Sequence, residues 1–336
     1  MSVKREKRVP EGLLLLRDNI HAKGNIFGAS AKAKWASGLG LTSQKETIFF
    51  AGCGYQFLDG AEATLSAVRA LDKRGLPWER TLGMTSFLNK LGINLGELYG
   101  KLTHRSPLSD NPLRCAVEVL QGMDIDCGCL AEEEPCCAGP LYYAGFQEEF
   151  ASRATEAQRI VQERGVTRII GMVPSCTYAL RELFPRFLKG WEVEVNHFLE
   201  VVWERMKEGK QFRLPQEVTV TYHDPCVLSR NLGLTEAPRE ILRSIEGVEF
   251  AEVERNKEEW STCCGGGGGF EVIFPEISHI LAVNRVKELL ETGASVIVTS
   301  CPGCLIQLRE GVKELKAPGV EVMDMAQLLR RALPEG

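Results

Sequence analysis

No stretch of the chain reaches the roughly eighteen uninterrupted apolar residues that a membrane-spanning helix needs. The first apolar run, LLLL at 13–16, is interrupted at once by Arg17 and Asp18, and the preceding segment is basic and polar. This start predicts neither a secretory signal peptide nor a membrane anchor. The net charge of only −5 gives no electrostatic footprint for nucleic acid. We expect a protein that binds no nucleic acid and has no direct membrane insertion.

Two cofactor motifs are also missing from the chain. It contains no C-x2-C-x2-C-x3-C-P run, the signature of ferredoxin-type clusters. It has no G-x-G-x-x-G motif that opens a helix after a strand, which would indicate a flavin or nicotinamide site. We therefore expect any electrons that this chain uses to come from another protein.

Cysteine, in contrast, is abundant. The chain has 336 residues, 12 of them cysteines, with 44% hydrophobic and 25% charged residues. A chain of this length can bury its own cores, so it needs no disulfide framework of the kind found in small secreted proteins. A reducing cytoplasm is the expected location, where clustered thiols more often bind metals or carry out redox chemistry.

Strands alternate with helices in both halves of the chain. In the second half, strand patterns occur at 217–224, 248–253 and 295–300 and helix patterns at 235–247, 274–294 and 301–316, before a last strand and helix. The first half repeats this order, with strands expected at 46–52, 124–130 and 167–173 and helices at 61–74 and 146–164. The alternation predicts an α/β fold of two homologous modules, with small, mainly parallel sheets flanked by helices and a pseudo-two-fold arrangement.

The cysteines of both halves follow the ends of predicted strands. Cys226 and Cys301 come just after strands of the second half, and Cys53 does so in the first. Ligand sites of parallel sheets lie beyond the carboxyl ends of the strands. These cysteines are therefore expected to form sites, because burial as small apolar residues suits a lone cysteine better than a series on loops.

The second half has a distinctive cysteine spacing, C-x36-CC-x36-C-x2-C. It runs through Cys226, Cys263, Cys264, Cys301 and Cys304. The adjacent pair makes a poor mutual disulfide, because a bridge needs geometry that neighbouring residues rarely reach. With the segments TYHDPC, CCGGGG and TSCPGC, this spacing resembles the cysteine-rich CCG domain of heterodisulfide reductase B and D subunits and of related iron–sulfur oxidoreductases. The resemblance covers nearly the whole chain from Glu46 onward.

The resemblance implies a noncubane [4Fe-4S] cluster in the second half, held by these five cysteines. Cys226, Cys263 and Cys264 would then also belong to the catalytic centre. Gly265 and Gly266 would let the backbone approach the cluster and point N–H groups at its sulfurs. Two alternatives stay open: a flexible linker for the glycines 265–269, and a zinc ion on four of the cysteines, which leaves Cys226 unexplained.

The first half departs from this pattern in two ways. Cys53 and Cys136 are separated by 82 residues, so an insertion is expected at roughly 75–110. Counted from Cys176, Ala179 stands where the second half has Cys304. Four thiols remain that could hold a second iron–sulfur cluster: Cys53, Cys136, Cys137 and Cys176. The other cysteines are expected in the core, with Cys127 or Cys129 as an alternative ligand: Cys115, Cys127 and Cys129.

These patterns divide the chain into a leader at 1–45, a degenerate first CCG domain at 46–212 and a complete second one at 213–336. The leader is a candidate arm for docking a partner. His223 is a candidate catalytic residue, as a proton donor to a cleaved sulfur, although a histidine at a strand end is as often part of a turn. Arg230 either binds an anionic group of a substrate or is simply solvated.

The resemblance implies an oxidoreductase, the iron–sulfur subunit of a heterodisulfide-reductase-like complex that acts on disulfide or thiol groups. Its expected partners are a ferredoxin-like, C-type iron–sulfur subunit and a flavoprotein subunit. Val227 stands where family members commonly carry a histidine, which weakens the case for a heterodisulfide-type substrate. The alternatives are a pure electron-transfer subunit that feeds a dehydrogenase or a low-potential reductase, and a zinc-binding scaffold.

Overall fold

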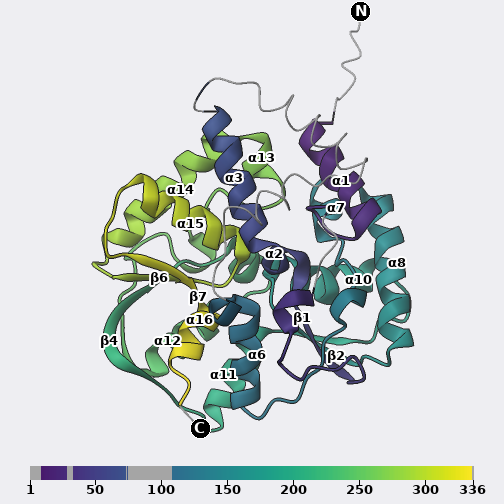
Figure 1. Ribbon diagram of the computed structural model, residues 1–336, viewed down its shortest axis with the longest axis horizontal. Helices are drawn as coiled ribbons and strands as arrows, with labels where there is room; N and C mark the ends of the chain where they lie inside the picture. The colour runs from purple at the N-terminus through teal and green to yellow at the C-terminus, as the bar shows by residue number, and fades with distance from the viewer. Residues whose placement is uncertain (1–8, 29–32, 73, 75–107, 335–336) are drawn as a thin grey trace, which may run out of the picture.

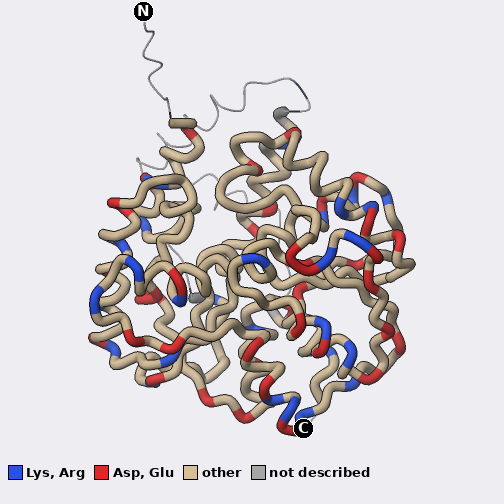
Figure 2. The backbone as a smooth tube through the Cα atoms, turned by 180° about the vertical axis from the view of Figure 1, so that it is seen from behind, with Lys and Arg blue, Asp and Glu red and all other residues tan. Residues whose placement is uncertain are grey.

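The computed structural model describes residues 9–28, 33–72, 74 and 108–334. Two parallel sheets, one in each half of the chain, lie on opposite sides of the molecule in this part (Figure 1). Lys, Arg, Asp and Glu are interspersed over the outer turns of the described chain (Figure 2). Up to residue 107, the predicted insertion at 75–110 lies outside the described residues.

The first half builds a three-stranded sheet in the order β1-β2-β3. Its strands are β1 (Thr47–Phe50), β2 (Arg168–Gly171) and β3 (Glu194–His197). Its helical segments are α1 (Glu11–Lys23), η1 (Ala33–Ala36), α2 (Gly52–Gln56), α3 (Leu58–Asp72), η2 (Leu108–Asp110), α6 (Pro112–Gly122), η3 (Ala131–Glu133), α7 (Gly139–Tyr143), α8 (Gln147–Glu163), α9 (Pro174–Tyr178), η4 (Ala179–Leu183), α10 (Phe184–Phe187) and α11 (Phe198–Lys207).

The second half builds a four-stranded sheet in the order β5-β4-β6-β7. Its strands are β4 (Phe212–Tyr222), β5 (Ile245–Phe250), β6 (Val296–Thr299) and β7 (Glu321–Asp324). Its helical segments are η5 (Val227–Asn231), α12 (Glu236–Ser244), η6 (Glu258–Trp260), α13 (Phe270–Ile273), α14 (Pro275–Leu290), α15 (Pro302–Glu314) and α16 (Met325–Arg331). All strand pairs of both sheets are parallel, as predicted.

The strand predicted at 124–130 is wrong. Only Gly128 bridges the sheet, in parallel to Ile48 of β1. The next residue, Cys129, donates its N–H to the carbonyl of Thr42, so the segment turns away to pair with the leader. The bridge nevertheless stands beside β1 as β5 stands beside β4, which gives the two sheets the same order.

The last strand of each sheet ends on a residue that caps the following helix. His197 accepts a hydrogen bond from the N–H of Leu199 at the start of α11, at 3.2 Å. Asp324 accepts one from the N–H of Ala326 at the start of α16, at 2.9 Å. A side chain that accepts from these first N–H groups satisfies donors that have no partner within the helix. This shared capping is independent support for two homologous modules.

Two pairs of helices pack across the contact between the two halves. Helix α6 of the first half packs against α16 of the second, and α12 of the second half packs against α11 of the first. Helices α6, α11 and α16 accordingly lie together at the lower centre of the molecule (Figure 1). This reciprocal exchange fits the predicted pseudo-two-fold arrangement.

The described part of the predicted docking arm packs on the chain itself. Ile20 of α1 is fully buried, and Leu16 is 9% exposed. Helix α3 crosses to the second half and packs against α13, α14 and α15, beside which it runs in Figure 1. No helix among the described residues has the length and apolar character needed to cross a membrane.

A buried hydrogen bond joins the halves at their centre. Tyr55 of α2 donates its hydroxyl to the carboxylate of Asp324, and both side chains are fully buried. Burial raises the pKa of Asp324 to about 6, against the opposing effect of the hydrogen bond from Tyr55. The ionised carboxylate therefore depends on this donor.

We expect Tyr55→Phe to lower the free energy of unfolding by about 1.5–3 kcal/mol at a pH well above 6, where Asp324 is ionised. The loss should shrink well below pH 6, because a protonated carboxyl needs the donor less. Denaturant unfolding at both pH values measures it. Tyr142→Phe is the control, because the described part of the chain offers the Tyr142 hydroxyl no hydrogen-bond partner. An equal loss in the two variants would contradict the prediction.

Candidate metal centres

The second half gathers its five pattern cysteines at the carboxyl edge of its sheet. Cys226 follows β4, and the adjacent pair Cys263 and Cys264 lies on the loop between η6 and α13. Cys301 follows β6 and caps the N-terminus of α15, and Cys304 lies in the first turn of that helix. Three loops that are distant in sequence therefore meet at one place.

These five thiols form one continuous set of interacting groups. The pKa of each thiol is shifted by the thiol next to it, in the order Cys226, Cys263, Cys264, Cys304 and Cys301. The Sγ atoms of Cys264 and Cys304 lie 3.2 Å apart. The structure thus brings together all the cysteines that the spacing of the second half singled out.

The pKa values of these thiols are shifted in different directions. Hydrogen bonding to Cys263, together with burial, raises the pKa of Cys264 well above its usual range. Hydrogen bonding to Cys264 and Cys301 does the same for Cys304. The hydrogen bond from Cys226 lowers the pKa of Cys263 instead. Neighbouring thiolates repel one another in a buried site, so a bound cationic centre is what would allow all five to ionise.

The glycine loop after the adjacent cysteines is built around their sulfurs. The N–H of Gly265 donates to Sγ of Cys263 at 3.3 Å, and that of Gly266 to Sγ of Cys264 at 3.5 Å. Gly265 has a φ of +81°, and a Cβ there would lie 2.4 Å from the carbonyl oxygen of Ser278. The backbone approach thus requires glycine at 265, which argues against the flexible-linker alternative.

This donor set fits an iron–sulfur cluster. Thiolates are the usual protein ligands of such clusters, and N–H groups directed at sulfur tune their reduction potential. A single tetrahedral zinc ion would use four of the thiolates and leave one without a metal. The contiguous fifth thiol therefore favours a centre with more than one metal ion.

His223 lies against this set of thiols and is 1% exposed. One of its ring nitrogens and the Sγ atoms of Cys264 and Cys304 all lie within 4.8 Å of one another. Its Nδ1 accepts a hydrogen bond from Nε of the fully buried Arg285, at 3.1 Å. Burial, and then the Arg285 guanidinium, lower the pKa of His223 well below its usual range.

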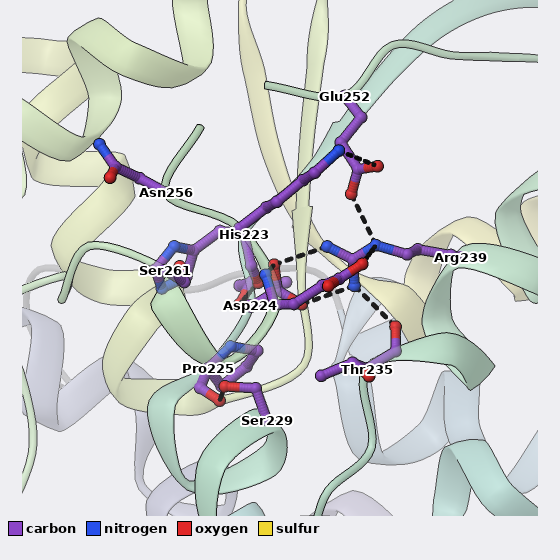
Figure 3. Close-up of polar contacts among 12 residues, drawn as sticks. His223, Asp224, Pro225, Ser229, Thr235, Arg239, Glu252, Asn256 and Ser261 are labelled. Atoms are coloured by element: carbon purple, nitrogen blue, oxygen red, sulfur yellow. Dashed lines mark hydrogen bonds and ion pairs between the residues drawn. The ribbon is translucent and has the colours of Figure 1, made fainter. Parts of the chain in front are cut away.

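A buried ion pair anchors the loop that leads to Cys263. Arg239 donates to both carboxylate oxygens of Asp224, at 2.8 and 2.9 Å (Figure 3). Asp224 also accepts the backbone N–H of Glu258, at 2.9 Å. The end of β4 and the loop of the adjacent cysteines are thereby fixed to each other.

Arg230 holds the same loop through its backbone. The Nε and Nη2 atoms of Arg230 donate to the carbonyls of Glu259 and Ser261, both at 2.7 Å. The guanidinium is therefore engaged in fixing the loop. This structural role was not predicted, and anion binding or simple solvation of Arg230 stay predictions.

The first half arranges its cysteines in the same way. One pocket is lined by all four of its pattern thiols, Cys53, Cys136, Cys137 and Cys176. The Sγ atoms of Cys137 and Cys176 lie 3.1 Å apart. The N–H of Ala138 donates to Sγ of Cys136 at 3.3 Å, with a φ of +56° at Ala138. An alanine thus adopts the left-handed conformation that Gly265 supplies more easily in the second half.

The thiol missing from the first half would stand at Val173. Val173 precedes α9 as Cys301 precedes α15, and both helices begin at a proline. Cys176 then takes the place of Cys304, as its short contact with the adjacent pair also indicates. The sequence-based match of Ala179 with Cys304 is therefore wrong, because it took Cys176 as the counterpart of Cys301.

The first site lacks the histidine as well. Phe50 ends β1 three residues before Cys53, as His223 stands three residues before Cys226, and Phe50 is 1% exposed. The two sites share a backbone design but differ in their fifth thiol and in this imidazole.

A carboxylate fixes the first site in place of the ion pair in the second. Glu134, which is 6% exposed, accepts the backbone N–H groups of Ala51 and Gly52 at 2.8 and 2.9 Å. It also accepts Nε2 of Gln56, at 2.8 Å. Glu134 thus ties the loop of the adjacent cysteines to the start of α2. In the first half the anchoring carboxylate belongs to this loop, whereas in the second half it belongs to Asp224 at the end of β4.

The two sites are neighbours across the contact between the halves. Burial, and then the charges of thiols from both sites, Cys176 of the first and Cys226 of the second among them, raise the pKa of Tyr143. Helix α2 packs against α15, where a Cβ on Gly54 would come within 2.6 Å of the Pro302 ring. The surroundings of one site are therefore built partly from residues next to the other.

The remaining cysteines lie in the hydrophobic core. Cys115, Cys127 and Cys129 are all buried there. The twelve cysteines are all free of disulfides.

Sequence reasoning did not single out Glu134 or Arg285, and it did not recognise Val173 as the counterpart of Cys301. Only Val173 had a usable signal in the sequence, because Val173 and Cys301 are each followed by a proline, one further residue and a cysteine.

The fold and sites define a protein of two cysteine-rich modules. The CCG family profile, described as a cysteine-rich domain, matches residues 102–181 and 220–309. These matches cover half of the chain, which therefore belongs to the CCG cysteine-rich domain family.

Several curated relatives are similar to this chain in sequence. The D subunit of dihydromethanophenazine:CoB–CoM heterodisulfide reductase from Methanosarcina acetivorans is 36% identical over 64% of this chain and 53% of its own length. The B subunit of fumarate reductase (CoM/CoB) from Methanothermobacter marburgensis is 31% identical over 73% of this chain and 48% of its own length. The EtfAB:quinone oxidoreductase of Syntrophomonas wolfei is 31% identical over 65% of this chain and 31% of its own length. The chain thus spans about half the length of the first two of these relatives and less of the third.

These three relatives are named as reductases or as an oxidoreductase. The predicted resemblance to the D subunit of heterodisulfide reductase is confirmed by this similarity.

We expect Gly265→Ala to destabilise the second site more than Gly268→Ala. Both positions have positive φ, which costs about 1–2 kcal/mol for a residue with a Cβ. Only Gly265 also faces a close backbone oxygen, because nothing lies within 4 Å of a Cβ on Gly268. Thermal unfolding and iron content per chain measure the effect. Equal losses in the two variants would contradict it.

Proposed function

We propose that this chain is the iron–sulfur subunit of a heterodisulfide-reductase-like complex. The observation that carries the proposal is the continuous set of five cysteine sulfurs in the second half, with backbone N–H groups directed at two of them. In this proposal the five thiolates hold a noncubane [4Fe-4S] cluster: Cys226, Cys263, Cys264, Cys301 and Cys304.

When bound, such a cluster takes up single electrons and offers an iron to a substrate sulfur. Cleavage of a disulfide to two thiols consumes two electrons and two protons. The chain's contribution is to hold the thiolates in place through Asp224, Arg230 and the glycine loop. A ring nitrogen of the His223 side chain lies near the Sγ atoms of Cys264 and Cys304, where it could present an N–H to a sulfur, which supports its proposed catalytic role.

The first site supports electron transfer rather than bond chemistry. Its four thiols match the number that ordinarily holds one cluster, and Val173 and Phe50 replace the fifth thiol and the imidazole. We propose that it holds a second iron–sulfur cluster through the four cysteines that line its pocket. The packing of α2, next to the first site, against α15 of the second suits electron transfer between them.

The proposed partners are a ferredoxin-like, C-type iron–sulfur subunit and a flavoprotein subunit. Two relatives are themselves named as subunits of larger enzymes, which supports assembly into a complex. The twelve free cysteines fit the proposed reducing, cytoplasmic location.

A pure electron-transfer subunit is the second candidate function. The four-thiol site next to the five-thiol site favours it, because two adjacent clusters can pass electrons without any substrate sulfur. A relative named EtfAB:quinone oxidoreductase is also consistent with it.

Iron and acid-labile sulfide per chain test the metal assignment. We expect Cys263→Ser to lose about one cluster's worth of iron, because Cys263 joins Cys226 to the rest of the set. Cys115→Ser is the control, since Cys115 is a buried cysteine that lies on α6 in the core. Zinc without sulfide in the wild type, or full iron in Cys263→Ser, would contradict the assignment.

Titration of the reduced complex with disulfides separates catalysis from relay. For a catalytic second site we expect a substrate-dependent change in the paramagnetic signal of its cluster, because a sulfur binds at an iron. The signal of the first site should stay unchanged and serves as the internal control. If no disulfide changes the paramagnetic signal of the second site, the result would favour the electron-transfer subunit.

A further inference from the structure

His223 and Arg285 form a buried, hydrogen-bonded pair that the cysteine pattern does not explain. Arg285 lies on α14, is 0% exposed and points its Nε at Nδ1 of His223. Its Nη1 donates to the carbonyl of Asn256 at 2.9 Å and to the carboxylate of Glu288 at 2.7 Å. A fully buried cation is costly unless it is paired, so this placement is a strong constraint.

The arginine decides which nitrogen of the histidine carries the proton. A guanidinium can only donate hydrogen bonds, so Nδ1 of His223 must accept with a bare lone pair. In a neutral imidazole the proton then lies on Nε2. Among the described residues Nε2 is buried and has no partner, although Cys264 and Cys304 are close to the ring.

The same geometry argues against His223 as a metal ligand. A ligating histidine donates its second ring N–H to a carboxylate or a carbonyl. Here the second nitrogen faces a donor instead. With its proton on Nε2, the ring has no lone pair left to offer to a metal.

We propose that Arg285 is a positioning residue that fixes the Nε2–H tautomer of His223, so that this N–H donates a hydrogen bond to a sulfur of the group held at Cys264 and Cys304. The proposal rests on the proposed function, since it needs that group. A hydrogen bond to a cluster sulfur stabilises the reduced, more negative state and raises the reduction potential. Phe50 supplies no such donor in the first site.

Electron–nuclear double resonance of the reduced wild-type protein, labelled with ¹⁵N-histidine and exchanged into D₂O, is the first test. We expect a weak ¹⁵N coupling and one exchangeable proton coupled to the second-site cluster. A strong ¹⁵N coupling, as for a direct iron–nitrogen bond, or no exchangeable proton would overturn the proposal.

Variants then test the role of the arginine. We expect His223→Leu to lose the proton coupling and lower the potential, and His223→Gln to restore both in part, because its side-chain amide can donate. Arg285→Met should weaken the same coupling and lower the potential. Lys287→Met, which removes an exposed positive charge from the same helix α14, is the control and should change neither.

The outcomes separate this inference from the proposed function. Full iron in the second site with wild-type coupling and potential in Arg285→Met would overturn the inference alone. Absence of second-site iron in the wild type would overturn the proposed function and the inference together. Should Arg285→Met fail to load iron, Arg285→Gln decides, because a side-chain amide can accept from Nδ1–H as well as donate to Nδ1 and so no longer imposes one tautomer. An unchanged coupling in Arg285→Gln would overturn the inference.

Discussion

The constraint on which the second half depends is the convergence of five cysteines in one place, two of which, Cys264 and Cys304, are buried. Thiolates so close together repel one another, and burial makes each charge more costly. The surrounding structure accordingly supplies what sulfur needs: strand ends that deliver three loops to one edge, backbone N–H groups at Gly265 and Gly266, and a loop held rigid by Asp224 and Arg230. A cationic inorganic centre completes this arrangement in the proposed function.

Duplication of the module explains why a second site exists at all, and substitution explains why the two differ. The same sheet order, the same helix caps and the same short sulfur contact recur in both halves. Val173 and Phe50 then remove one thiol and one imidazole without disturbing that backbone. The exchange of α6 and α12 between the halves keeps both sites in one body.

Much of this arrangement could be predicted from the sequence, because spacing and strand pattern are local signals. The five cysteines of the second half and the parallel sheets were readable in this way. Ala179 was matched wrongly because counting from one cysteine ignored the proline that starts each helix. Arg285 could not be predicted, since nothing in the pattern of a long helix tells which arginine will be buried against a histidine 62 residues earlier.

The asymmetry between the sites also bears on how electrons and protons could be divided between them. Of the two sites, as far as the described residues go, only the second has a buried imidazole N–H beside its thiols, which can hydrogen-bond to a sulfur that gains electrons. The first site has thiols and a carboxylate, Glu134, whose hydrogen bonds are used to hold the backbone. In the proposed function, bond chemistry therefore belongs to the second half and one-electron storage to the first. The packing of α2 against α15, next to both sites, would let electrons pass from one site to the other.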